Sequence, residues 1–476
     1  MELVIGLEVH CQLGTASKLF CSCPASSFGA SPNSSACPIC TGQPGTLPVL
    51  NRKAVELAYS AAMALGCKLR PRSIFARKNY FYPDLPKGYQ ISQYEEPFSE
   101  HGGLDIAGPK RVRILRIHME EDAGKLLHAV AGAELDGSLV DFNRAGVPLI
   151  EIVSEPDIRS SEEAFQYLTN LKEILQFAGV SRCDMEKGEM RCDANVSVRP
   201  RGAEKFGTRA EIKNLNSFRG VRDAIDYEFK RQCAALERGE RIVQETRLWD
   251  AERRVTESLR SKEEAHDYRY FPEPDLVPLE AEEALVARVR AALPEAPSAR
   301  RTRFMNDYAL TEYDAGVLTA ERALADYFEK AVAVCGKELA KSAANWMQSE
   351  LMAKLNAEAK TVADSPVRPE SLGELAALVQ KGTLSGKMGK ELFPKMWETG
   401  KAPAELVKEL GLTQVTDSGQ VGVWADEAIA ENPKIVADVR AGKERAIGAL
   451  VGAVMKKSKG KANPALVNDL LKEKLK

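Results

Sequence analysis

Apolar and polar residues alternate in several short segments of the first 220 positions. In Leu3–Leu13 the odd positions are all apolar, whereas Glu8 and His10 occupy even ones. A period of two predicts a strand with one buried and one polar face. A carboxylate and an imidazole on one face can bind a metal or act as an acid/base pair, although edge strands also show polar residues to solvent. Both interpretations stay open for this segment alone.

Two later segments repeat this pattern. The segment RCDANVSV carries Asp193 and Asn195 on its polar parity, and TRAEIKNL carries Glu211 and Lys213. Each of them by itself fits a half-solvated sheet face at least as well as a site. Together these segments give a recurrent supply of carboxylate and other polar groups with interspersed cations.

The segment Val112–Glu121 ends in two adjacent carboxylates, Glu120 and Glu121. Adjacent residues on a strand face opposite ways, so only one of the two is expected to point at a shared site. Arg116 and His118 have the parity of Glu120. Which carboxylate serves the site stays open at this stage.

The apolar run Pro148–Val153 predicts a buried strand, yet it carries Glu151 at its centre. A buried charge is costly without a partner, so either a structural ion pair or a functional site must accommodate it. The preceding residues 143–146 have turn chemistry and include a fixed cation, Arg144, which we predict to contact a cofactor.

Helical patterns appear over Asn51–Gly66 and Glu162–Gly179, and again from Phe218 onward. After about Pro297 the chain is helical and rich in Ala, Glu, Lys and Leu. We therefore predict an α+β protein with a mixed-sheet catalytic domain over residues 1–295, an all-α domain over 296–405, and a small helical tail domain over 406–476.

The stretch Arg77–Pro97 combines aromatics, Pro, Gly and cations without a helical or strand period. Long irregular loops in compact domains tend to be functional or disordered, and the aromatic content argues against disorder. We predict a nucleotide or phosphate loop that uses Lys78 and Lys87. A packed surface loop is the alternative.

Charge is unevenly distributed along the 476 residues. The formal net charge of -2 excludes a globally basic nucleic-acid binder, but residues 433–476 contain nine Lys and two Arg against two Asp and two Glu. This basic end predicts a contact with RNA phosphates, although a solvated helical face is the commoner cause. The cluster comprises Lys456, Lys457, Lys459 and Lys461.

The start of the chain lacks the basic region of a signal peptide, and no apolar run approaches membrane-spanning length. We expect a cytoplasmic protein without a membrane partner. In that compartment the ten cysteines are not expected to form a disulfide framework. Two close pairs flank a polar loop, and their spacing predicts a structural Zn²⁺ site, with unliganded thiols as the alternative. These are Cys21, Cys23, Cys37 and Cys40.

Recurrent carboxylates with interspersed cations favour Mg²⁺, and Mg²⁺ together with Lys and Arg favours phosphoryl transfer. The phosphate-binding pattern G-x-x-x-x-G-K-[ST] is absent from the sequence. A kinase-like activity would therefore need a different phosphate cradle.

The run LVDFNRAGVPLIEIVSEPD at Leu139–Asp157 resembles the signature of the GatB family, the B-type subunits of the tRNA-dependent aspartyl/glutamyl amidotransferases. Other blocks of that family occur along the chain in the order that the family has: IGLEVH, RKNYFYPDLPKGYQIS, HMEEDAGK, RCDAN, KNLNS and DYRYFPEPDL. The resemblance spans essentially the whole chain. It implies a kinase-like cradle, a helical domain and an RNA-binding tail.

The resemblance also implies an activity and its residues. It implies ATP-dependent phosphorylation of the side-chain carboxylate of Glu-tRNA(Gln) or Asp-tRNA(Asn), followed by amidation. The implied Mg²⁺ ligands are Glu8, His10, Glu121 and Glu151. The residues implied around ATP and the acceptor are Glu120, Asp193, Asn195, Glu211 and Lys213. The four cysteines occur in some members only, so zinc rests mainly on their spacing.

Ammonia must come from a partner, because the sequence has neither a Cys after Met1 nor a Gly/Ser-rich amidase signature. The family arrangement implies a separate amidase (glutaminase) partner that hydrolyses glutamine and a small third partner that holds the pair together. Two other classes remain: a non-catalytic zinc-containing scaffold that binds tRNA, and a metal-dependent hydrolase. The residues do not tell which of the two mischarged tRNAs is the substrate.

Overall fold

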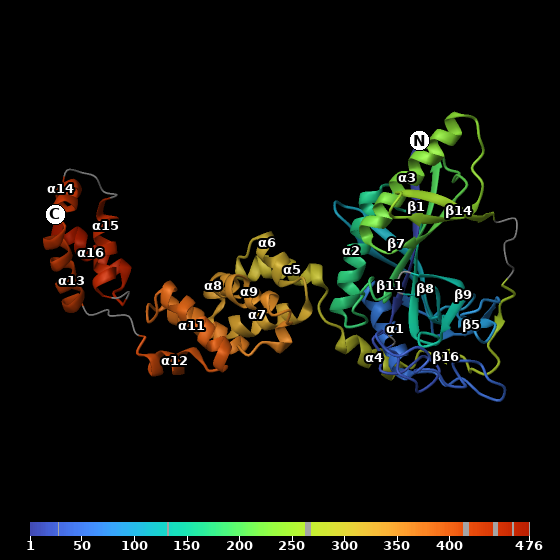
Figure 1. Ribbon diagram of the computed structural model, residues 1–476, viewed down its shortest axis with the longest axis horizontal. Coiled ribbons are helices and arrows are strands. Elements are labelled where there is room, and N and C mark those ends of the chain that lie inside the picture. Colours follow the sequence, from blue (N-terminus) through green and yellow to red (C-terminus); the bar gives the residue numbers. More distant parts are fainter. Residues whose placement is uncertain are drawn as a thin grey trace. The chain divides into compact units, whose positions relative to one another are not determined.

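The computed structural model describes residues 1–26, 28–130, 133–261, 268–412, 418–440, 446–458 and 461–475. The chain divides into two compact units, Met1–Ala296 and Pro297–Lys476 (Figure 1). The division lies one residue beyond the first predicted boundary. The second predicted boundary, between 405 and 406, falls within helix α12 (Pro403–Leu410), so a separate tail domain stays a prediction.

A nine-stranded mixed sheet organises the first unit, with the order β14-β13-β12-β11-β1-β10-β7-β6-β2. Neighbouring strands are antiparallel except β12 and β13. The strands are β1 (Glu2–Gln12), β2 (Lys68–Leu69), β6 (Ser99–Asp105), β7 (Arg111–Glu121), β10 (Pro148–Ser154), β11 (Met190–Arg199), β12 (Ala210–Leu215), β13 (Glu245–Asp250) and β14 (Val255–Ser261). The mixed sheet confirms the α+β class, whereas its likeness to a kinase stays a prediction.

Helices pack on the apolar face of this sheet. They are α1 (Arg52–Ala64), α2 (Ser161–Phe177) and α3 (Phe218–Glu237), all three predicted from the sequence. The apolar parity of β1 is buried against them in one core. Because side chains alternate along a strand, the polar parity is left on the opposite face. The site is built on that face.

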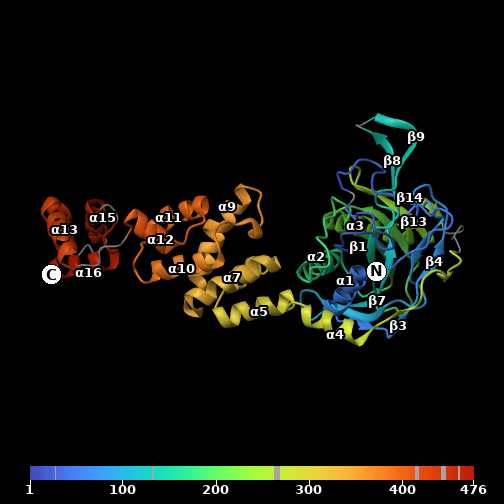
Figure 2. The same cartoon turned by 90° about the horizontal axis from the view of Figure 1, so that it is seen from below.

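Smaller sheets complete the first unit. Strands β4 (Ala76–Asn79) and β5 (Tyr89–Ser92) form an antiparallel pair extended by β15 (Phe271–Pro272). The prediction that 77–97 lacks strands is therefore wrong in part; two four-residue strands of mainly polar residues leave too little periodicity to detect. The remaining strands are β3 (Arg72–Ser73), β16 (Leu279–Glu280), β8 (Lys125–Val130) and β9 (Ala133–Asp141). Figure 2 shows the β8–β9 hairpin projecting from this unit.

The second unit is helical, as predicted. After α4 (Glu283–Ala292) of the first unit come α5 (Pro297–Tyr308), α6 (Glu312–Leu318), α7 (Arg322–Cys335), η2 (Lys337–Leu339), α8 (Ala340–Trp346), η3 (Met347–Leu351), α9 (Met352–Ala357), η4 (Val362–Asp364), α10 (Pro369–Gln380), α11 (Gly386–Thr399), α12, α13 (Ser418–Glu431), α14 (Pro433–Arg440), α15 (Ile447–Lys457) and α16 (Pro464–Leu475). Helices α13–α16 share their own apolar core. Within the described ranges, none of the helices combines the length and apolar character that a membrane span requires.

A buried carboxylate joins two helices of the second unit. Asp314 of α6 accepts hydrogen bonds from Lys341 and Thr311, and Gln348 Nε2 donates to its Oδ1 over 3.2 Å. The Lys341 and Thr311 hydrogen bonds lower the pKa of Asp314 to about 2. A depressed pKa stabilises the fold above the unfolded value of about 3.9, and this stabilisation is lost as the pH falls toward the folded value.

Replacing Asp314 by Asn is therefore expected to lower the free energy of unfolding by about 1–2 kcal/mol at pH 7. The loss should shrink as the pH falls from about 4 toward 2, because the carboxylate of the unfolded chain is protonated in this range before the native one. Urea unfolding at several pH values measures it. Asp307→Asn is the matched control, since that side chain is 43% exposed and lies 3.6 Å from Lys337 Nζ; an equal loss in both variants would contradict the prediction.

Candidate functional site

The strand register brings the predicted polar residues together on one face of the sheet. His10 of β1 lies opposite Glu151 of β10, and Glu151 lies opposite His118 of β7. On the other side of β1, Glu8 lies opposite Asp193 of β11. Directly opposed residues of antiparallel strands project from the same face. The alternation seen in the separate segments therefore converges on one site.

Four side chains form what we term the carboxylate–imidazole group: His10, His118, Glu120 and Glu151. His10 Nε2 lies 3.4 Å from Glu151 Oε2 and 3.6 Å from Glu120 Oε1. His118 Nε2 lies 3.3 Å from Glu151 Oε2 and 3.8 Å from Glu120 Oε2. One ligand atom each from His10, Glu120 and Glu151 lies within 4.8 Å of the others. Two carboxylates and an imidazole at this spacing fit a divalent cation.

Opposite charges stabilise this group. Burial raises the pKa of Glu151, but His118 and His10 outweigh burial and hold that pKa well below its ordinary value. Burial lowers the pKa of His118, but the Glu151 and Glu120 carboxylates raise it to about 9. Among the described residues, the buried Nδ1 of His118 has no hydrogen-bond partner. The carboxylates are thus held ionised, as metal ligands must be.

Glu120 and Glu121 point to different places, as expected for neighbours on a strand. Ser92 Oγ donates to Glu120 Oε2 over 3.2 Å, within the group just described. Glu121 forms an ion pair with Lys87 and accepts a 2.9 Å hydrogen bond from the backbone N–H of Ile91. The geometry therefore brings Glu120 next to His10 and Glu151, and it separates Glu121, the ligand that the resemblance implied, from them.

A second cluster, the lysine–carboxylate group, lies on β1, β11 and β12. Asn195 Nδ2 donates to Glu8 Oε1 over 2.9 Å. Lys213 Nζ lies 2.9 Å from Asp193 Oδ2 and 3.1 Å from Glu211 Oε1. Glu8 and His10 are two positions apart on β1, so they project from the same face, and burial and the charge of Glu151 raise the pKa of Glu8. All five residues were predicted from the sequence, and the structure brings them together.

The two lysines predicted to bind a cofactor have different surroundings. Lys78 Nζ lies 4.9 Å from the ring centre of Tyr268. Burial lowers the pKa of Lys78, but the charges of Glu120, Tyr270 and Glu151 raise it above its ordinary value. Lys87 pairs with Glu121.

Arg144, the third predicted cofactor residue, makes contacts of another kind. Its Nε donates to Ala123 O over 3.0 Å and lies 3.7 Å from Asp122 Oδ1. Its Nη2 donates to Gly124 O. Arg144 therefore fixes the backbone after β7, and its cofactor contact stays a prediction.

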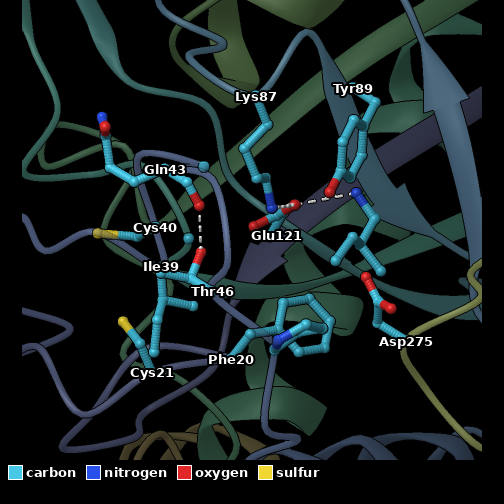
Figure 3. A pocket seen from close by; sticks show the side chains of 14 residues that line it. Phe20, Cys21, Ile39, Cys40, Gln43, Thr46, Lys87, Tyr89, Glu121 and Asp275 are labelled. Atoms are coloured by element: carbon cyan, nitrogen blue, oxygen red, sulfur yellow. Dashed lines mark hydrogen bonds and ion pairs between the residues drawn. The ribbon is translucent and has the colours of Figure 1, made fainter.

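The four predicted cysteine ligands gather at one point: ligand atoms of Cys21, Cys23, Cys37 and Cys40 lie within 4.8 Å of one another. The hydrogen bond from Cys21 is the main reason that the pKa of Cys40 is lowered, to about 4. Four sulfurs at this spacing can hold a metal ion. Figure 3 shows the neighbouring cavity of about 80 Å³, with Cys21 and Cys40 on one wall and the Lys87–Glu121 pair on the other.

The predicted RNA-binding lysines lie near the end of the second unit. Lys456 is exposed, and Lys461 Nζ lies 3.5 Å from Gly411 O. Lys457 Nζ pairs with Glu427 at 3.0 Å and Glu431 at 2.7 Å. Lys459 lies outside the described residues. The contact of this cluster with RNA stays a prediction.

Two residues beside these sites were not predicted as site residues. His118 has the parity of Glu120, and that parity was the signal that could have identified it. Lys18 is completely buried beside Cys40. A lone lysine between a Ser and a Leu carries no comparable sequence signal.

Comparisons with known proteins show the family of this chain. A family described as "GatB/GatE catalytic domain" matches residues 3–287, and one described as "GatB domain" matches residues 326–475. Two relatives, each named as the B-type subunit of an aspartyl/glutamyl-tRNA(Asn/Gln) amidotransferase, match over nearly their whole length. The chain is 54% identical to the protein of Carboxydothermus hydrogenoformans over 100% of this chain and 98% of that one. It is 56% identical to the protein of Geotalea daltonii over 99% of this chain and 98% of that one. The chain therefore belongs to the GatB family, the B-type subunits of the aspartyl/glutamyl-tRNA(Asn/Gln) amidotransferases.

Proposed function

We propose that this chain carries out the ATP-dependent amidation of mischarged tRNA within an amidotransferase complex. Its substrate is Glu-tRNA(Gln), Asp-tRNA(Asn) or both, and its product is Gln-tRNA(Gln) or Asn-tRNA(Asn). Ammonia comes from an amidase (glutaminase) partner, and a small third partner completes the complex. The observation that carries the proposal is the gathering of two carboxylates and two imidazoles next to a lysine–carboxylate group on one sheet face.

The chemistry of amidation explains why such a face is needed. A side-chain carboxylate resists ammonia until one of its oxygens becomes a leaving group, and transfer of the γ-phosphoryl group of ATP achieves this. A phosphoryl group in transfer carries spread negative charge, which cations stabilise. We assign Mg²⁺ to His10, Glu120 and Glu151, with Glu8 nearby. When bound there, Mg²⁺ would neutralise charge on the phosphates of ATP.

A cavity beside the site can hold the nucleoside of ATP. It has a volume of about 280 Å³ and opens next to Glu8 and Asn195. Leu115, Val153 and Phe206 supply apolar surface in it. Ligand pockets are typically apolar with a few polar groups that fix orientation. We place the adenosine here, so that its phosphates reach toward Glu8 and Lys213.

Reconstitution tests the proposal. The chain is combined with a candidate amidase and a candidate small partner, and each mischarged tRNA is assayed with ATP and glutamine. Formation of Gln-tRNA(Gln) or Asn-tRNA(Asn) that depends on this chain is expected. The chain alone is expected to release no ammonia from glutamine. A full complex that binds tRNA but forms no amidated product would contradict the proposal and favour a non-catalytic tRNA-binding scaffold.

We also propose that the end of the second unit binds tRNA phosphates through the exposed Lys456, together with Lys457, Lys459 and Lys461. Removing residues after 412 is expected to weaken tRNA binding at least about tenfold at low salt, with a smaller difference at high salt, because each phosphate contact releases counterions. Binding titrations at several salt concentrations measure this effect. Equal affinity of both proteins at every salt concentration would contradict it.

For the four cysteines we propose structural Zn²⁺. A closed four-sulfur site leaves no open coordination position, so it holds the loop and supplies no catalysis. The cytoplasm as the compartment stays a prediction from the sequence.

A further inference from the structure

The loop that carries the four cysteines is hydrogen-bonded to the turn that precedes β10. Asn33 Oδ1 accepts from the backbone N–H of Phe142 over 2.7 Å. Asn143 Nδ2 donates to Ser31 O over 2.7 Å, and its Oδ1 accepts from the N–H of Ser35 over 2.7 Å. Asn143 is 1% exposed. The cysteine loop and this turn therefore form one hydrogen-bonded assembly.

Lys18 lies at the centre of that assembly and is completely buried. Its Nζ lies 2.6 Å from Ser35 O, 3.4 Å from Phe142 O and 3.6 Å from Cys40 Sγ. An ammonium group has three N–H donors and no acceptor, so the three acceptors match it. A buried cation is costly unless a counter-charge is near. Of its three partners, only the Cys40 sulfur can carry a negative charge.

The same assembly approaches the Lys87–Glu121 ion pair at two glycines, Gly146 of the turn and Gly42 of the cysteine loop. Gly146 has a φ of +84°, and a Cβ there would lie 3.3 Å from Cys40 Cβ, 3.5 Å from Lys18 Cδ and 3.9 Å from Glu121 Oε2. A Cβ at Gly42 would lie only 2.5 Å from Lys87 Cγ. Gly42 of the cysteine loop therefore packs closely against Lys87, and Gly146 of the turn lies between Cys40, Lys18 and Glu121.

We infer that Lys18 is a positioning residue of the cysteine metal site. We also infer that this site fixes the backbone around Gly42 and Gly146, which forms the wall next to Lys87 and Glu121. The inference rests on metal binding by the four cysteines, proposed above. Four thiolates around Zn²⁺ leave two negative charges, and the buried ammonium offsets one of them. Its hydrogen bonds to Ser35 and Phe142 then couple the metal loop to the turn before β10.

The first test compares Lys18→Met with the unchanged full chain in zinc competition against a coloured chelator. Zinc affinity is expected to fall at least about tenfold, as for other groups that orient metal ligands. Lys53→Met is the control, because the Lys53 side chain is 61% exposed. Equal zinc affinity in a folded Lys18→Met variant overturns the role of Lys18. A wild-type chain without zinc affinity instead overturns the metal assignment, and neither outcome bears on amidation.

The second test needs no variant and applies even if Lys18→Met does not fold. Zinc is removed from the wild-type chain, and amide hydrogen exchange is followed by mass spectrometry. Exchange is expected to rise in peptides that cover 140–147 and 85–91, and to stay constant in peptides of α13–α16. Restoring zinc should reverse the rise. Unchanged exchange in both regions on zinc removal overturns the coupling to the wall.

Discussion

Replacing Glu151 by Gln is expected to lower tRNA-dependent ATP cleavage by about a hundredfold to a thousandfold, the range seen when a group that stabilises transition-state charge is lost. Gln has nearly the same shape as Glu, so packing in the apolar strand is kept. What disappears is the negative charge that lies 3.3 Å from His118 Nε2 and 3.4 Å from His10 Nε2. The affinity for tRNA should be nearly unchanged, because the side chain is only 12% exposed.

Two measurements separate the interpretations of this variant. Phosphate release from ATP in the presence of mischarged tRNA reports the activation step, and a binding titration reports tRNA affinity. Glu240→Gln removes a 54% exposed carboxylate that pairs with Arg238, and it serves as the control. Turnover that survives in Glu151→Gln would mean that this chain is a scaffold whose partners perform the chemistry.

The convergence of the strands on one site could be predicted only in part from the sequence. Alternation identified Glu8, His10, Asp193 and Glu211 as residues of polar strand faces, because a period of two is visible in a single segment. Which strands are neighbours is not visible there: β1 pairs with β10 and β11, about 140 and 185 residues away. Long-range pairing depends on how the three helices cover the other face, and no local pattern encodes that arrangement.

Other features escaped prediction for local reasons. Strands β4 and β5 have four residues each, too few to establish a period. His118 was not predicted as a site residue although its parity was noted, because its partner Glu151 lies on a strand that is distant in sequence. The gathering of the four cysteines could be predicted, because ligand spacing along the chain is itself the signal, while zinc binding there stays a prediction. Lys18 had no such signal, because its burial beside Cys40 is visible only in the folded chain.

Replacing Glu120 by Gln is expected to weaken the binding of Mn²⁺, used as a spectroscopic substitute for Mg²⁺, by at least about a hundredfold. Even groups that only orient a ligand contribute about 10–100-fold to metal affinity, and a lost carboxylate ligand should cost no less. Glu120 Oε1 lies 3.6 Å from His10 Nε2, and its side chain is 4% exposed. Electron paramagnetic resonance titration of free Mn²⁺ measures the affinity without any need for activity.

The adjacent Glu121→Gln variant is a closely matched control, because it makes the same chemical change in an equally buried side chain. It removes the ion pair with Lys87 but leaves His10 and Glu151 untouched. Mn²⁺ affinity should therefore stay close to that of the unchanged protein. The opposite result, with affinity lost in Glu121→Gln and kept in Glu120→Gln, would restore the ligand set implied by the family resemblance. In that case the backbone at the end of β7 would have to rotate when the metal binds, so that Glu121 faces His10 and Glu151. Such a rotation would be needed because neighbouring strand residues face opposite ways.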